Sequence, residues 1–166
     1  YQILKQFPLE TLALGDADAD SVESMDLGIA RTRFGQPHRE LATAEWQALL
    51  ERFERDGYAI EQTEWHHSRF EPPEGDRAAR SEVSATIHAA RAQPAHRVIL
   101  RATLDVTWSP RVDAQDVPIP ERIALSKLDL LERHAPAAFE KVFEVERLGT
   151  RFPILPLLVY DLDGDG

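Results

Sequence analysis

The chain has 166 residues, 29 of them acidic and 19 basic, and it carries a formal net charge of −10 at pH 7. An interface with nucleic acid needs clustered lysine and arginine side chains that neutralise phosphates, so this balance argues against a nucleic-acid partner. The absence of cysteine excludes disulfides, thiolate metal sites and cysteine nucleophiles. No apolar run approaches the roughly 20 residues needed to cross a bilayer, so no transmembrane segment is expected.

The first part of the chain gives mixed signals. Pro8 interrupts any helix near the N-terminus, and Gly15–Asp20 is predicted to form a loop. Met25–Arg31 alternates apolar with small or polar residues, which favours a strand. A helix that begins near Ser21 is the alternative for this stretch.

The clearest helix is predicted over Thr43–Asp56, with Thr43 as its N-cap. Gly57 suits the left-handed position that often ends a helix. The apolar residues of this segment recur with the spacing of a single helical face. They are Trp46, Leu49, Leu50 and Phe53.

Long strands separated by short turns follow the helix. Tyr58–Phe70 continues without glycine or proline, and turns are predicted at Glu74–Asp76 and at Gln93–His96. After each turn, apolar residues alternate with polar ones, as in strands with one buried face. The alternating apolar residues are Val83, Ala85, Ile87 and Ala89 in the first segment and Val98, Leu100, Ala102, Leu104, Val106 and Trp108 in the second.

A last strand is predicted after a polar loop at Pro110–Pro120. Its apolar residues change phase after Leu125 and resume at Leu128, which predicts a β-bulge near Ser126–Lys127.

Together these elements predict an α+β domain over residues 1–136, in which a curved antiparallel sheet wraps around the apolar face of one helix. In that arrangement the helix lies beneath the even-numbered residues of the strands. The order of the elements resembles that of NTF2-like and cystatin-like domains, and this resemblance is one of architecture, which does not by itself give function.

The last six residues hold three aspartates at alternate positions. Asp161, Asp163 and Asp165 occupy positions 1, 3 and 5 of an Asp-x-Asp-x-Asp-Gly pattern, and Gly166 stands at position 6. Calcium takes six to eight oxygen ligands, often from alternate residues of a loop that turns sharply at a glycine. The spacing therefore predicts that the three aspartates are metal ligands, with calcium as the cofactor.

The residues before these aspartates distinguish two families of calcium loop. Leu157–Tyr160 is apolar and predicted to be a strand, whereas EF-hand and dockerin loops are entered from a helix. Val159–Gly166 resembles the opening of an FG-GAP or VCBS repeat of integrin-like β-propellers. The resemblance implies that residues 137–166 are a linker and the start of such a repeat, and that the first domain contacts a following β-propeller. It also implies an extracellular, periplasmic or cell-surface protein.

The sequence thus favours a non-enzymatic recognition or spacer domain that binds an unidentified protein or surface ligand. One alternative is an NTF2-like enzyme or small-ligand pocket, in which a carboxylate–imidazole pair would act as a general base. Its candidate residues are Glu64, His66, His88 and Asp105. The other alternative is a calcium module of the dockerin or EF-hand type.

A second run of alternating aspartates lies near the N-terminus. Asp16, Asp18 and Asp20 are followed by Ser21, which stands where a calcium loop has glycine. We interpret this run as a solvated loop without a metal.

We expect this chain to bind calcium weakly or not at all, because the ligands from positions 7 to 12 of the calcium pattern are missing after Gly166. Calorimetric titration with calcium checks this expectation. A dissociation constant in the micromolar range would contradict it.

Overall fold

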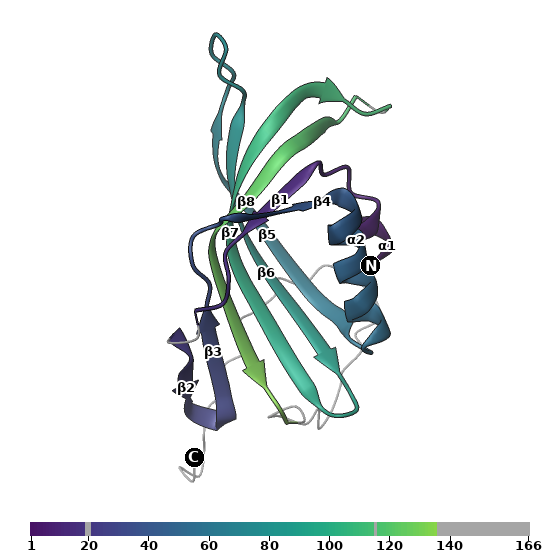
Figure 1. Cartoon of the computed structure of the whole chain (residues 1–166), viewed down its shortest axis with the longest axis vertical. Coiled ribbons are helices and arrows are strands. Elements are labelled where there is room, and N and C mark those ends of the chain that lie inside the picture. The colour runs from purple at the N-terminus through teal and green to yellow at the C-terminus, as the bar shows by residue number, and fades with distance from the viewer. Residues whose placement is uncertain (19–20, 115, 136–166) are drawn as a thin grey trace, which may run out of the picture.

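Antiparallel strands make up most of the structure. The computed structural model of the chain describes residues 1–18, 21–114 and 116–135 (Figure 1). Its elements are, in chain order, α1 Gln2–Lys5, β1 Thr11–Leu14, β2 Glu23–Met25, the 3₁₀ turn η2 Asp26–Gly28, β3 Ile29–Arg33, β4 Arg39–Ala42, α2 Thr43–Arg55, β5 Ala59–Glu71, β6 Arg80–Arg91, β7 His96–Val112 and β8 Pro118–Arg133. In this part of the chain α2 is the one helix of seven or more residues, so the predicted α+β class is confirmed at that level.

Several predictions concern residues that the structure does not describe. The domain boundary at residue 136 and the proposed calcium ligands Asp161, Asp163 and Asp165 lie outside the described residues. Among the helices that are described, none has the length and apolar character needed to cross a membrane.

One sheet joins the eight strands of the described residues. Its main path runs β2–β3–β8–β7–β6–β5, and neighbouring strands are antiparallel along the whole path. β1 joins this path by pairing in parallel with β8, and it also pairs antiparallel with β4. Figure 1 shows β5–β8 as four long strands, with α2 alongside.

β7 is the longest strand and has a long neighbour along each edge. It pairs with β6 without a register shift. Against β8 the register shifts by one residue between Thr103 and Leu104, and the extra residue on β8 is Ser126. The β-bulge predicted near Ser126–Lys127 is therefore confirmed.

Two hydrophobic clusters form the core of the described residues. The cluster between β6 and β7 consists of Ala85, Leu104 and Val106. The cluster beside α2 consists of Leu9, Leu12 and Leu41. Ile123 and Leu125 of β8 pack against both clusters, so β8 connects the two parts of the core. The buried apolar residues of β7 are the even-numbered ones, as the alternation predicts.

α2 is attached chiefly to the N-terminal segment. The Thr43 hydroxyl donates a hydrogen bond to the Leu9 carbonyl at 2.5 Å, and the Trp46 Nε1–H donates one to the Leu4 carbonyl at 3.2 Å. Leu50 is buried, but Leu49 keeps 47% of its surface exposed. The strands therefore cover less of the helix face than the predicted wrapped arrangement requires.

The prediction for α2 is wrong at its N-cap and confirmed at the glycine that follows its C-terminus. The N-cap is Ala42 instead of Thr43, and the Ala42 N–H donates a hydrogen bond to the Glu45 carboxylate at 2.9 Å. The Glu45 side chain, three residues into the helix, thus accepts the hydrogen bond of the Ala42 N–H. The alanine side chain of the cap residue cannot accept a hydrogen bond itself. Gly57 has a φ of 84°, the left-handed conformation predicted for it.

Two other predicted segments need correction. Met25–Arg31 is not one strand, because β2 ends at Met25 and η2 turns the chain into β3. Leu27 adopts a positive φ of 59° in this turn, which an alternation of apolar residues does not reveal. The loop predicted over Pro110–Pro120 is shorter, because β7 continues to Val112 and β8 begins at Pro118.

Gly15 lies where two backbone segments approach too closely for a side chain. A Cβ atom there would lie 2.6 Å from the carbonyl carbon of Gly35 and 2.8 Å from the carbonyl oxygen of Gln36. We expect Gly15→Ala to lower the free energy of unfolding by roughly 3 kcal/mol, because rigid backbone has to move. Urea denaturation measures this loss. Gly35→Ala is the matched control, since a Cβ on Gly35 meets only the Asp16 carbonyl at 3.8 Å; equal losses in both variants would contradict the steric explanation.

Candidate functional site

A row of polar and aromatic side chains crosses one end of the sheet. Arg91 pairs with His96 across β6 and β7, and Arg97 pairs with Arg133 across β7 and β8. Continuing this register by one residue brings His134 opposite His96, on the face that buries Val98. The imidazole rings of His96 and His134 stack, with centroids 4.1 Å apart and planes at 4°.

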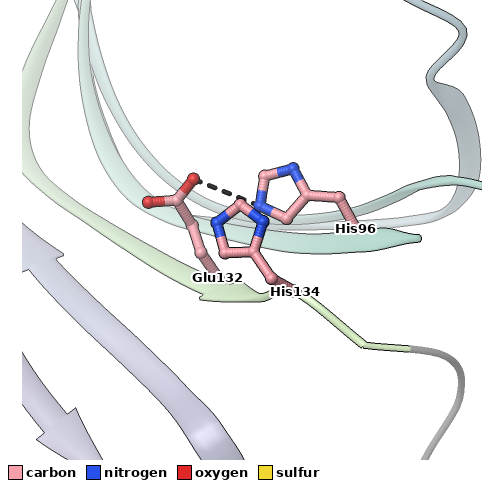
Figure 2. A group of neighbouring side chains, drawn as sticks. All are labelled: His96, Glu132 and His134. Carbon is pink, nitrogen blue, oxygen red and sulfur yellow. Dashed lines mark ion pairs between the residues drawn. The ribbon is translucent and has the colours of Figure 1, made fainter. Parts of the chain in front are cut away.

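Glu132 completes a group of three potential metal ligands with the two histidines (Figure 2). Its Oε1 lies 3.3 Å from His96 Nε2. One ligand atom from each of His96, Glu132 and His134 can be chosen so that all three lie within 4.8 Å of one another. Two imidazoles and one carboxylate therefore converge at the end of β7 and β8.

Tyr58 supports His96 from the opposite side of the imidazole ring. Its hydroxyl is hydrogen-bonded to His96 Nδ1 at 2.5 Å. The Tyr58 ring stacks on Phe53 of α2, with centroids 4.2 Å apart, and the Arg91 guanidinium lies over it at 4.9 Å. The end of the helix and the start of β5 thus fix the hydroxyl that orients His96.

The surroundings of His96 disfavour its protonated form. Only 5% of His96 is exposed, and this burial lowers the pKa of its imidazole below the ordinary 6.5. The charges of His134 and Arg91 act in the same direction, while Glu132 opposes them. His96 Nε2 is buried and has no hydrogen bond, so the Glu132 carboxylate lies near this nitrogen without being hydrogen-bonded to it.

The edge of the sheet formed by β5 has a different character. β5 pairs only with β6 among the described strands, so its outer edge carries unpaired backbone groups. Of its thirteen residues, all but Ile60 and Glu71 are exposed. Trp65 and Phe70, two of the large apolar side chains that the described residues expose, keep 48% and 56% of their surfaces exposed on this one strand.

The structure does not gather the residues predicted for an enzymatic pocket. Glu64, His66, His88 and Asp105 lie on one face of the sheet but in four successive cross-strand rows. The rows of His88 and Asp105 are six residues apart along β6, roughly 20 Å at the usual rise of a strand. Asp105 lines a cleft of about 430 Å³, which the other three do not line.

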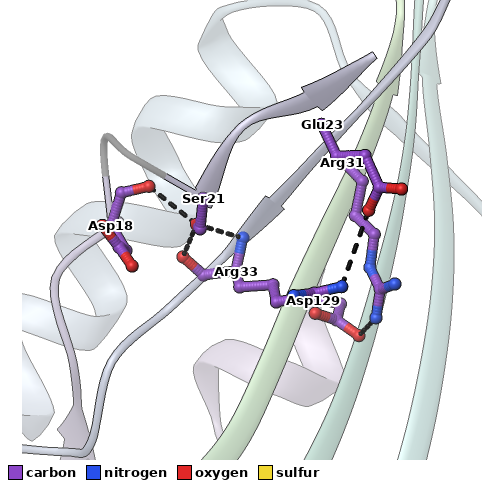
Figure 3. Close-up of polar contacts among 6 residues, drawn as sticks. All are labelled: Asp18, Ser21, Glu23, Arg31, Arg33 and Asp129. Carbon is purple, nitrogen blue, oxygen red and sulfur yellow. Dashed lines mark hydrogen bonds and ion pairs between the residues drawn. The ribbon is translucent and has the colours of Figure 1, made fainter. Parts of the chain in front are cut away.

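The loop with Asp16 and Asp18 is held by contacts of its own. Asp16 Oδ2 lies 3.1 Å from His38 Nε2. The Ser21 hydroxyl donates to the Asp18 carbonyl at 2.7 Å and accepts from the Arg33 N–H at 3.1 Å (Figure 3). Asp20 lies outside the described residues. In the described ranges, the aspartates of this loop are in no group of three potential metal ligands.

Sequence reasoning missed the group at His96. The signals were present, because two histidines flank the segments predicted as the last two long strands. Their meeting depends on the exact register of β7 and β8, which the sequence alone did not supply. Comparisons with family models, curated proteins and solved structures found no match to this chain.

The contact between Tyr58 and His96 predicts a measurable loss of stability. We expect Tyr58→Phe to lower the free energy of unfolding by about 1–3 kcal/mol, because His96 Nδ1 is left buried without a partner. Urea denaturation in the presence of a chelator measures the loss. Tyr1→Phe is the control, since it removes a hydroxyl that donates to the Tyr58 carbonyl and leaves the Tyr58 hydroxyl in place. A loss in Tyr58→Phe no larger than that in the control would show that the hydroxyl satisfies no buried group.

Proposed function

We propose that this chain is a non-enzymatic recognition domain that binds through the outer edge of β5. The observation that carries the proposal is the exposure of this long edge strand along nearly its whole length. An exposed edge can extend its sheet with a strand from another chain, whose backbone groups satisfy its own. The large exposed side chains Trp65 and Phe70 supply apolar area for such a contact.

The occupant that fits this edge is β5 of a second copy. In an antiparallel pairing centred on Trp65, Glu61 lies opposite Arg69 of the other copy, and Glu64 lies opposite His66. Two-fold symmetry produces each of these pairs twice. Centring the pairing on Glu64 would instead oppose two glutamates, and centring it on His66 would place Glu61 opposite Glu71. Charge complementarity therefore selects the register at Trp65.

The faces of β5 agree with this register. Ile60, Trp65 and Phe70 pair with β6 at positions on the apolar face, opposite Ala89, Ala85 and Ser81. The proposed pairing sets Ile60 against Phe70 and Trp65 against Trp65, so apolar residues meet on one face of the joined sheet. Register shifts at Glu61 and Ser68 limit the regular part of β5 to Gln62–His67. Trp65 and the Glu64–His66 pair lie inside this part, whereas the Ile60–Phe70 and Glu61–Arg69 contacts are made at and beyond the two bulges.

We also propose, on the sequence resemblance, that this domain stands before a calcium-binding β-propeller in an exported protein. The resemblance of Val159–Gly166 to an FG-GAP or VCBS repeat supports this context, with Asp161, Asp163 and Asp165 as calcium ligands. The finer likeness of the fold to NTF2-like or cystatin-like domains is likewise a proposal, supported by one amphipathic helix beside a long antiparallel sheet.

A charge-exchange experiment tests self-association through β5. We expect the chain to form a dimer in sedimentation equilibrium, and Glu61→Arg or Arg69→Glu alone to weaken it about tenfold or more. Each single variant creates two like-charge contacts in the dimer, and exposed cross-strand pairs contribute roughly 0.2–1 kcal/mol each. The double variant, Glu61→Arg with Arg69→Glu, restores opposite charges and is expected to recover most of the lost affinity.

The control for this experiment is Glu51→Arg, which reverses a charge on the exposed face of α2 and leaves β5 unchanged. It is expected to dimerise like the unaltered chain. Trp65→Lys places two ammonium groups at the centre of the interface and is expected to give monomers. A chain that stays monomeric at all concentrations, or a dimer that persists in Trp65→Lys, would overturn the proposal.

A further inference from the structure

We propose that His96, Glu132 and His134 form a zinc site at the end of the sheet. The observations behind this proposal are separate from those behind the edge-strand proposal, because they concern different residues and a different ligand. It begins from the convergence of three potential ligand atoms within 4.8 Å.

The donor set selects the metal. Imidazole nitrogen suits zinc and related transition ions, whereas calcium and magnesium prefer sites made wholly of oxygen. Two histidines and one carboxylate are a known zinc donor set, and they leave a fourth position for water. This site is therefore chemically distinct from the calcium loop predicted at Asp161–Asp165, which offers carboxylates only.

His96 is already arranged as a ligand. A zinc-bound histidine usually donates its second ring N–H to a partner that fixes the orientation of the ring. The Tyr58 hydroxyl oxygen lies 2.5 Å from His96 Nδ1 and can accept that hydrogen bond. The free nitrogen, Nε2, is buried, has no hydrogen bond and lies 3.3 Å from a Glu132 oxygen.

His134 must move to complete the site. Stacked parallel rings direct their nitrogen lone pairs side by side, whereas bonds of about 2.0–2.1 Å to one tetrahedral zinc need donor atoms roughly 3.3 Å apart with converging lone pairs. His134 follows the last residue of β8 and is exposed, so its side chain can turn without disturbing the core. Zinc binding thus exchanges the ring stack for coordination.

A proton is the competing occupant of the gap between His96 and Glu132. If His96 carries its hydrogen on Nε2, that nitrogen lies 3.3 Å from a Glu132 oxygen and Nδ1 accepts a hydrogen bond from the Tyr58 hydroxyl. A small movement of the Glu132 side chain would then give an Nε2–H···Oε1 hydrogen bond, which stabilises the fold without a metal. The two possibilities differ in whether zinc binds, which makes the competing one an outcome of the test.

Calorimetric titration of the metal-stripped full chain with zinc tests the proposal. We expect one zinc ion per chain with a dissociation constant at or below about 1 μM, a rise in melting temperature with zinc, and no equivalent rise with calcium or magnesium. Cobalt provides a spectroscopic check, because a tetrahedral site gives visible absorption that an exposed histidine with water ligands does not.

Three variants locate the binding. His134→Ala removes an exposed ligand and is expected to weaken zinc binding at least tenfold with little change in the stability of the metal-free chain. Tyr58→Phe removes the orienting hydroxyl and is expected to weaken it about 10–100-fold. His88→Ala is the control, since His88 lies opposite Gln62 and outside the ligand group, and its zinc affinity is expected to be unchanged.

Two results would overturn the zinc site. One is the absence of zinc binding by the folded chain at tens of micromolar metal, which would leave the proton as the occupant. The other is binding that survives His134→Ala unchanged, which would place the zinc at other histidines.

Discussion

The register between β7 and β8 is the constraint on which the rest of the structure depends. Successive side chains of a strand point to opposite faces, so a shift of one residue moves every later side chain to the other face. The bulge at Ser126 makes such a shift. It returns Leu128 and Leu130 to the face that carries Ala102 and Leu100 of β7. Without it, both leucines would point to the polar face and the apolar core would end at Leu125.

The same shift determines what stands at the end of the sheet. Glu132 and His134 follow Leu130 at intervals of two residues, so the bulge that buries the leucines also turns this carboxylate and this imidazole toward His96. In an unbulged ladder, Arg133 would lie opposite His96 and repel a metal ion. A packing requirement in the middle of β8 therefore creates the ligand group at its end.

Features that follow from the spacing of apolar residues along one segment were predicted from the sequence. Features that depend on how two strands align were not. α2, the alternation in β6 and β7 and the bulge at Ser126 all follow from the spacing of apolar residues along one segment. The turn at Leu27 was missed because a left-handed φ at a leucine has no compositional signal. The gathering of His96 with His134, and the separation of His88 from Asp105, depend on how strands align with one another. A single sequence shows which residues of a strand share a face. It does not show the register with the neighbouring strand, because a shift of two residues leaves the same residues on each face.

Tyr58 connects the two proposed sites through a single short stretch of chain. Its ring is fixed between Phe53 and Arg91, and its hydroxyl contacts His96, while the next residue, Ala59, begins the edge strand. A contact that holds Tyr58 therefore also holds the point from which β5 starts. Because β5 has a neighbour on one side only among the described strands, its ends have fewer contacts to prevent fraying than those of β6 or β7. Filling the site at His96 would reduce the freedom of the first residues of β5, including Glu61, so zinc binding and pairing along this edge are expected to favour one another.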